Sequence, residues 1–182
     1  GRPAWRTPVP DRAMWVNGKL ARGREAQLSL FDRGARDGEG IFETVRVERG
    51  RAQHWRRHLE RLVLAAAELG FPVPPSPSAL SAALGDVLAA NDLSDAVVRI
   101  TVTRGIPGGR PTRAGCWIEA ESLSGRLWRG TRTGQASAMI SAVPFSPGPI
   151  GRFKTTSRLA YNLARVGTLA VGSLLAFAGI VL

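Results

Sequence analysis

The chain has 182 residues, of which 44% are hydrophobic, and its 25 Lys and Arg against 14 Asp and Glu give a formal net charge of +11. That hydrophobic content is typical of a globular protein and excludes a disordered chain, while the single cysteine, Cys116, excludes an internal disulfide and a thiolate zinc site. The basic residues are spread from Arg2 to Arg165 and form no nucleic-acid-binding motif, so we expect no nucleic-acid partner despite the charge.

The first predicted elements are extended. Residues 14–16 are predicted to form a short strand, because they are apolar and precede Asn17-Gly18, a dipeptide that favours a tight hairpin turn. A second extended piece is predicted at 27–31, before a glycine-containing loop at 32–40. The β-branched and aromatic residues of 41–47 then predict a strand that ends in a turn at 49–51.

Two amphipathic helices are predicted next. From Trp55 the apolar residues recur with a helical period and fall on one face, at Leu59, Leu62, Val63, Ala66 and Leu69. Gly70 and Pro72 are expected to end this helix. After the proline-rich residues 72–77, a second helix carries Leu80, Leu84, Val87 and Leu88.

Further strands follow, and the element order predicts the fold. Val98, Ile100 and Val102 alternate with polar residues, as in a half-buried strand. Strands are also predicted at 116–118 and 136–143, and a helix is predicted to start near Thr155. This order predicts an α+β fold with a sheet and two helices on one side of it. We expect an N-terminal extension (1–13), a small α+β domain (14–143), an interdomain linker (144–153) and the start of a second, α/β domain (154–182).

Few of the residues that could carry chemistry form a motif by themselves. Gly38-Glu39-Gly40 lacks the spacing of a dinucleotide-binding loop and precedes a strand rather than a helix, so a turn is expected there. His54 and His58 have no cysteine or suitably spaced acidic partner, so we expect them on a helix surface and predict no metal site. Cys116 lies in an apolar strand and is expected to be a buried small residue.

The two lysines stand out in a chain whose other 23 basic residues are arginines. A desolvated lysine can lose its proton and attack a carbonyl, whereas arginine stays charged. Lys19 follows the hairpin turn and is expected in solvent. Lys154 follows a stretch rich in proline and glycine, so it is the candidate for chemistry, with a solvated lysine at a helix start as the alternative.

Five blocks of sequence resemble a known family. In chain order they are Val16-Asn17-Gly18, the segment 31–44 with Asp32-Arg33-Gly34 and Gly38-Glu39-Gly40-Ile41-Phe42-Glu43-Thr44, His58-Leu59-Glu60-Arg61-Leu62, Thr101-Val102-Thr103-Arg104-Gly105 and Lys154-Thr155-Thr156. Together they resemble the class IV aminotransferases, the fold-type IV pyridoxal-phosphate enzymes that include branched-chain and D-amino-acid aminotransferases and aminodeoxychorismate lyase. The resemblance covers residues 14–165.

The resemblance implies roles for four residues. Lys154 would form the Schiff base with pyridoxal 5'-phosphate and move a proton between substrate and cofactor. Arg61 would bind the cofactor phosphate, since a guanidinium fork suits a dianion. Phe42 would line the substrate pocket, with a core phenylalanine as the alternative. Arg110 would reach the substrate carboxylate across a dimer interface, with an exposed loop arginine as the alternative.

The implied activity is the transfer of an amino group between a branched-chain or D-amino acid and a 2-oxo acid, in a cytoplasmic homodimer. Leu159 stands where branched-chain members usually have a tyrosine, which favours the D-amino-acid or lyase branch, whereas Glu43 matches the aminotransferases. The alternative is aminodeoxychorismate lyase, which releases pyruvate and 4-aminobenzoate. Release of pyruvate without a 2-oxo acid acceptor would distinguish the lyase.

The last residues do not match the family. The family continues beyond the lysine into a large domain that completes the cofactor site, whereas 166–182 is a run of 17 uncharged residues. This length is at the lower edge of a membrane span, but we expect a truncated or frame-shifted continuation, or a buried helix and strand, rather than membrane contact. We therefore expect this chain alone to bind pyridoxal phosphate weakly and to have little activity. A non-catalytic relic or interaction module is the second alternative.

Overall fold

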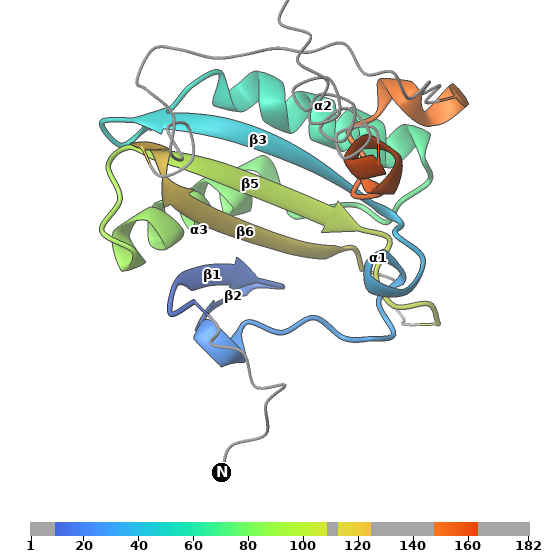
Figure 1. The fold of residues 1–182 in the computed structure, drawn as a ribbon, viewed down its shortest axis with the longest axis horizontal. Coiled ribbons are helices and arrows are strands. Elements are labelled where there is room, and N and C mark those ends of the chain that lie inside the picture. The colour runs from blue at the N-terminus through green and yellow to red at the C-terminus, as the bar shows by residue number, and fades with distance from the viewer. Residues whose placement is uncertain (1–9, 109–112, 125–147, 164–182) are drawn as a thin grey trace, which may run out of the picture.

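The structure is a computed structural model that describes residues 10–108, 113–124 and 148–163. In these residues six strands form one antiparallel sheet in the order β2-β1-β6-β5-β3-β4 (Figure 1). The strands are β1 (Ala13–Val16), β2 (Lys19–Arg22), β3 (Gly40–Glu48), β4 (Arg51–Ala52), β5 (Ala96–Thr103) and β6 (Gly115–Ser122). The helices are α1 (Arg33–Arg36), α2 (Trp55–Glu68) and α3 (Pro77–Ala90), with 3₁₀ turns η1 (Gly23–Glu25) and η2 (Gly148–Arg152).

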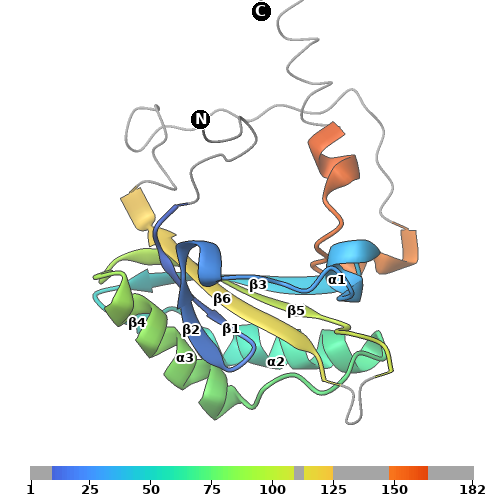
Figure 2. The ribbon, with the colours of Figure 1, turned by 90° about the horizontal axis from the view of Figure 1, so that it is seen from below.

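Helices α2 and α3 cover one face of the sheet, and the short helix of residues 159–163 lies on the other side (Figure 2). Each long helix buries its apolar stripe, with Leu59 and Leu62 on α2 and Leu80 and Val87 on α3. Helix α3 begins where expected after the proline-rich segment, because the Ser76 hydroxyl accepts a hydrogen bond from the backbone N–H of Ala79. The predicted two-layer α+β fold is confirmed for the described residues.

The strands alternate between the two faces of the sheet, which decides where the polar groups lie. Val98, Ile100 and Val102 of β5 belong to the core under the helices, so Arg99, Thr101 and Thr103 lie on the opposite face. On β3 the core residues are Ile41, Val45 and Val47. Glu43 shares their parity and therefore lies on the face that α2 covers.

The lysine segment pairs with the edge of β3. Strand β4 pairs only with Val47 and Glu48, which leaves the first half of β3 open at that edge. There the backbone N–H of Phe42 donates to the carbonyl of Lys154 at 2.8 Å, and Thr155 forms a bridge with Ile41. The helix predicted to start near Thr155 is therefore wrong, since it begins at residue 159. Edge pairing with β3, together with the β-branched threonines, favours the extended backbone.

Other expectations have mixed outcomes. The hairpin at Asn17-Gly18 and both long helices are confirmed, whereas residues 27–31 form no strand. The predicted strand at 136–143, Arg110 and the apolar tail at 166–182 lie outside the described residues. The domain boundaries at 13, 143 and 153 stay predictions. Within the described part of the chain, no helix is both long enough and apolar enough to cross a membrane.

Candidate active site

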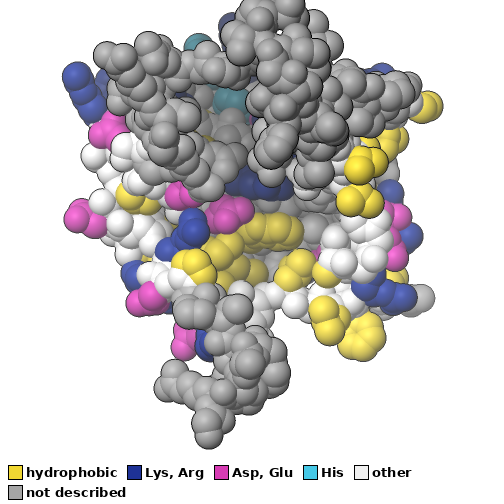
Figure 3. Space-filling model, viewed as in Figure 1, with side chains coloured by type: hydrophobic (Ala, Val, Ile, Leu, Met, Phe, Trp, Pro, Cys, Tyr) yellow, Lys and Arg dark blue, Asp and Glu magenta, His cyan; other side chains and the backbone are white. Residues whose placement is uncertain are grey.

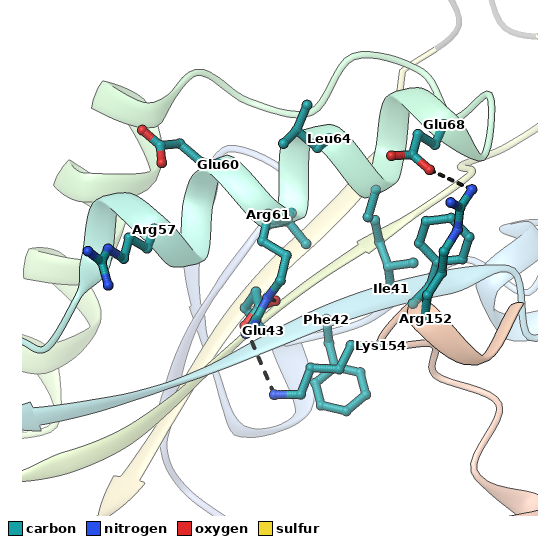
Figure 4. A pocket seen from close by; sticks show the side chains of 13 residues that line it. Ile41, Phe42, Glu43, Arg57, Glu60, Arg61, Leu64, Glu68, Arg152 and Lys154 are labelled. Atoms are coloured by element: carbon teal, nitrogen blue, oxygen red, sulfur yellow. Dashed lines mark hydrogen bonds and ion pairs between the residues drawn. The ribbon is translucent and has the colours of Figure 1, made fainter. Parts of the chain in front are cut away.

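A cavity of about 450 Å³ lies between α2 and the lysine segment. Its walls come from the first half of β3, from one side of α2 and from residues 152–154 (Figure 4). Phe42, Glu43, Arg61 and Lys154 all line it, so residues far apart in the sequence meet here.

Glu43 is the most buried polar group of this cavity, with 2% of its side chain exposed. Its Oε1 accepts a hydrogen bond from Arg61 Nε at 2.5 Å, and its Oε2 accepts one from Arg61 Nη2 at 2.6 Å. His58 Nδ1 lies 2.8 Å from the same Oε2. Burial alone would raise the pKa of Glu43, but the hydrogen bonds from Arg61 and His58 outweigh it and hold that pKa below its ordinary value. The carboxylate is therefore charged and paired at neutral pH.

Lys154 reaches the cavity from the extended segment at the edge of β3. Its Nζ lies 4.0 Å from Glu43 Oε2 and 5.2 Å from the centre of the Phe42 ring. Figure 4 shows the amine directed at the carboxylate, next to the ring. Partial burial lowers the pKa of Lys154, and the charge of Glu43 opposes this effect.

Three guanidinium groups lower the pKa of Lys154 further, those of Arg61, Arg158 and Arg99. Together with burial they outweigh the single carboxylate, so the pKa of the amine is lower than that of a solvated lysine. A larger fraction of the amine is uncharged at neutral pH as a result, which is the form that attacks carbonyl groups.

The glycine loop before β3 holds the lysine segment in place. The Thr156 hydroxyl donates to the carbonyl of Gly38 at 3.0 Å and lies 3.3 Å from that of Gly40. A Cβ at Gly40 would lie 2.7 Å from the same hydroxyl, so a larger residue would push Thr156 away. The Gly38-Glu39-Gly40 turn therefore packs against the residues that follow Lys154.

A second cavity, of about 520 Å³, lies on the face of the sheet away from the helices, and both Phe42 and Lys154 line it as well. The Arg99 guanidinium carbon lies 3.9 Å from the centre of the Phe42 ring, and that of Arg158 lies 6.0 Å from it. Glu119 also lines this cavity. Figure 3 views this face, where basic and acidic side chains gather next to hydrophobic ones. The ring of Phe42 therefore separates the helix side of the site from a polar side.

The structure brings together three of the four residues singled out from the sequence. Lys154, Arg61 and Phe42 line one cavity, whereas Arg110 lies outside the described residues. The burial of Cys116 is confirmed, and burial raises the pKa of its thiol to about 12. His54 is exposed, as expected.

The expectation for His58 is wrong, and three functional candidates were missed. The side chain of His58 is 20% exposed and lies against Glu43 rather than on an open helix surface. Glu43 stood out in the sequence only as a mark of subtype, although a carboxylate within an apolar strand is a signal of a buried partner. Arg99 gave a similar signal, since it alternates with the apolar residues of β5. Nothing in the sequence pattern singled out Arg158.

Comparison with known proteins gives a family match. The family described as "Amino-transferase class IV" matches residues 40–172. The D-alanine aminotransferase of Listeria innocua is 33% identical over 95 residues, which are 52% of this chain and 33% of that protein. The putative branched-chain-amino-acid aminotransferase of Methanocaldococcus jannaschii is 32% identical over 93 residues, 51% of this chain and 32% of that protein. The matched part thus spans about a third of the length of these curated relatives.

Solved structures agree with the fold. A branched-chain amino acid aminotransferase with pyridoxamine 5'-phosphate, from the organism abbreviated T.th., superposes with a TM-score of 0.71 at 21% identity, and the match covers 90% of this chain and 57% of that one. The branched-chain aminotransferase of Thermoproteus uzoniensis with norvaline has a TM-score of 0.53 at 27% identity, with 61% of this chain and 40% of that one covered.

Proposed function

Since the chain belongs to the class IV aminotransferase family, we propose that it takes part in pyridoxal-phosphate-dependent transfer of an amino group between an amino acid and a 2-oxo acid, with Lys154 as the amine that holds the cofactor. The observation that carries this proposal is the meeting of an amine of lowered pKa, Lys154, and a guanidinium, Arg61, in one cavity. The two groups suit the aldehyde and the phosphate of one molecule.

The residues of the cavity fit pyridoxal phosphate by their donor chemistry. Arg61 uses its Nε and one Nη2 hydrogen on Glu43, so the N–H groups at the end of the guanidinium remain for a phosphate dianion. When bound, the cofactor supplies an electron sink for the bonds at the substrate α-carbon. Lys154 can accept the proton released from that carbon because its pKa is lowered, and it can return the proton at the other position.

The Phe42 side of the site suits the amino acid substrate. Phe42 offers an apolar surface, and Arg99 and Arg158 supply positive charge next to it, which attracts a carboxylate. The names of the relatives cover both D-alanine and branched-chain substrates, and we propose no choice between them. Arg110 as a further carboxylate ligand, the homodimer and the division into a small domain, a linker and a cofactor-binding domain stay proposals.

Borohydride trapping tests the role of Lys154. Incubation with pyridoxal phosphate followed by reduction fixes the cofactor to the amine that holds it, and peptide mass spectrometry locates the adduct. We expect the label on Lys154 and much less on Lys19, which is the other lysine of the chain. Lys154→Ala should abolish site-specific labelling, and Lys19→Ala is the matched control. Equal labelling of both lysines, or none, would overturn the proposal.

Amino transfer tests the reaction itself. Formation of a 2-oxo acid from D-alanine or a branched-chain amino acid, in the presence of a 2-oxo acid acceptor, should depend on Lys154. Pyruvate release from aminodeoxychorismate without an acceptor would favour the lyase instead.

A further inference from the structure

A buried carboxylate lies between the two cations that the proposed function requires. Glu43 binds Arg61 through two hydrogen bonds, and its Oε2 lies 4.0 Å from Lys154 Nζ. Figure 4 shows Glu43 beneath Arg61 of α2 and facing Lys154. Glu43 therefore touches both groups from a position on the helix side of β3, behind the Arg61 guanidinium.

We propose that Glu43 is a positioning residue that aims the Arg61 guanidinium at the cofactor phosphate and holds the Lys154 amine beside it. This inference rests on the proposed function and deepens it. The site then prefers a phosphorylated pyridine aldehyde over the unphosphorylated one through Glu43, although Glu43 itself contacts only Arg61, His58 and Lys154.

The geometry of the guanidinium supports this role. A guanidinium has five N–H donors, and Glu43 uses one on Nε and one on Nη2. The three donors that remain lie at the far end of the group, where they can bind a second oxyanion with two parallel hydrogen bonds. Glu43 thus occupies one edge of the fork and fixes the direction of the other.

Arg61 needs such a partner because its side chain is otherwise free to move. It is 60% exposed, and a solvated arginine loses much rotamer entropy when a ligand orders it. A guanidinium that is already oriented loses less, so phosphate binds more tightly. Arg56 on the same helix has a different partner, since its Nε bonds the exposed Glu60.

Glu43 itself is held rigidly. It lies within β3 between the buried residues Ile41 and Val45, and His58 bonds its second oxygen. A buried carboxylate without partners is strongly unfavourable, so Glu43 cannot turn away from these cations at low cost. Its direction is therefore set by the sheet and by α2 together.

The charges around Lys154 give the inference a second consequence. The groups that act on the amine are Glu43 from β3, Arg61 from α2, Arg99 from β5 and Arg158 from its own segment. Glu43 is the one acid among these four, so its charge retains the proton on Lys154. Removal of that charge should let the amine lose its proton at lower pH.

The preference for phosphate can be measured directly. Lys154 in the full chain is labelled by borohydride reduction with pyridoxal 5'-phosphate or with pyridoxal, and the ratio of the two rates is the phosphate preference. Glu43→Gln should lower this ratio about tenfold, the effect of losing one well-made charged hydrogen bond. Glu48→Gln is the matched control, because Glu48 lies on the same strand and pairs with Arg46 away from the cavity.

A double-variant cycle separates aiming from a general loss of structure. Arg61→Gln should also lower the ratio, and Glu43→Gln should then have no further effect in that background. If Glu43→Gln does not fold, Glu43→Asp replaces it. This variant keeps the charge but withdraws it from Arg61, so it too should lose the phosphate preference.

The pH dependence of labelling by pyridoxal provides a readout that loosening alone would move the other way. Glu43→Gln should shift the midpoint for Lys154 to lower pH, whereas a merely loosened site would hydrate the amine and shift it to higher pH. An unchanged phosphate ratio in a folded Glu43→Gln variant, or a midpoint shifted upward, would overturn the inference while Lys154 remains the labelled residue. Absence of Lys154 labelling in the unaltered chain would instead overturn the proposed function, and this inference with it.

Discussion

Asp32 and Glu43 are both carboxylates with 2% of their surface exposed, but the regions around them differ. Asp32 accepts hydrogen bonds from the backbone N–H of Gly34 at 2.7 Å and from the Thr103 hydroxyl at 2.9 Å. Both donors are neutral, and they fix the start of α1 against the end of β5. Glu43 instead binds Arg61 and His58 and faces Lys154.

The difference shows that the partners of a buried carboxylate, rather than its burial, indicate its task. Neutral backbone and hydroxyl donors commit the carboxylate to the fold. Cationic side chains with unused donors direct it toward a ligand. Substitutions in each region can test whether the two are as separate as this comparison requires.

The largest effect on stability is expected at Asp32. Asp32→Ala removes the cap of α1 and leaves the buried Thr103 hydroxyl without its acceptor, so the free energy of unfolding should fall by about 3 kcal/mol. Urea unfolding followed by circular dichroism measures this change. The ratio of labelling by pyridoxal phosphate to that by pyridoxal should stay as it is in the unaltered chain. A drop in that ratio would show that the two regions are coupled.

A smaller loss of stability is expected for Glu43→Gln, about 1 to 2 kcal/mol at neutral pH, because the exposed side of Arg61 can return to water. The pKa of Glu43 is below its ordinary value in the folded chain, so the ionised group stabilises the fold above that ordinary value. This contribution disappears as the pH falls through the folded-state pKa. The difference between the unaltered chain and Glu43→Gln should therefore shrink in acid. A constant difference across the acid range would contradict the pairing.

The link between the glycine loop and the lysine segment should be worth about 1 kcal/mol. Thr156→Val keeps the shape of the side chain but removes the hydroxyl that donates to the Gly38 carbonyl. Labelling of Lys154 should slow a few fold as its segment loosens. Thr155→Val is the control, since Thr155 meets β3 through its backbone. Equal slowing in both variants would mean that the hydroxyl does not hold the segment.

The smallest effect is expected at the ion pair of Arg152 and Glu68, which is 2.8 Å long but lies in solvent. Arg152→Ala should change the free energy of unfolding by about 0.5 kcal/mol or less. The same urea experiment measures it. A loss as large as that of Glu43→Gln would show that burial of the carboxylate adds nothing to an arginine pair.

Local patterns were sufficient for the elements that bury a stripe of apolar residues. The helical spacing of Leu59, Leu62 and Ala66 predicted α2, and the Asn17-Gly18 pair predicted the first hairpin. Resemblance in short motifs was enough to assign Lys154 and Arg61 to one site. The helix near Thr155 failed for a different reason, since the partner that keeps this segment extended is Ile41, far away in the sequence.

The sequence by itself determined the two-layer fold and the identity of the candidate amine, because apolar periodicity, turn residues and motif spacing are local properties. Only the tertiary structure decided what surrounds that amine. Glu43 and Arg61 are 18 residues apart, and Thr156 meets a carbonyl 118 residues away. Such contacts depend on which face of β3 a side chain takes and on where α2 crosses it. For this reason the carboxylate that links the two cations emerged from packing and not from pattern.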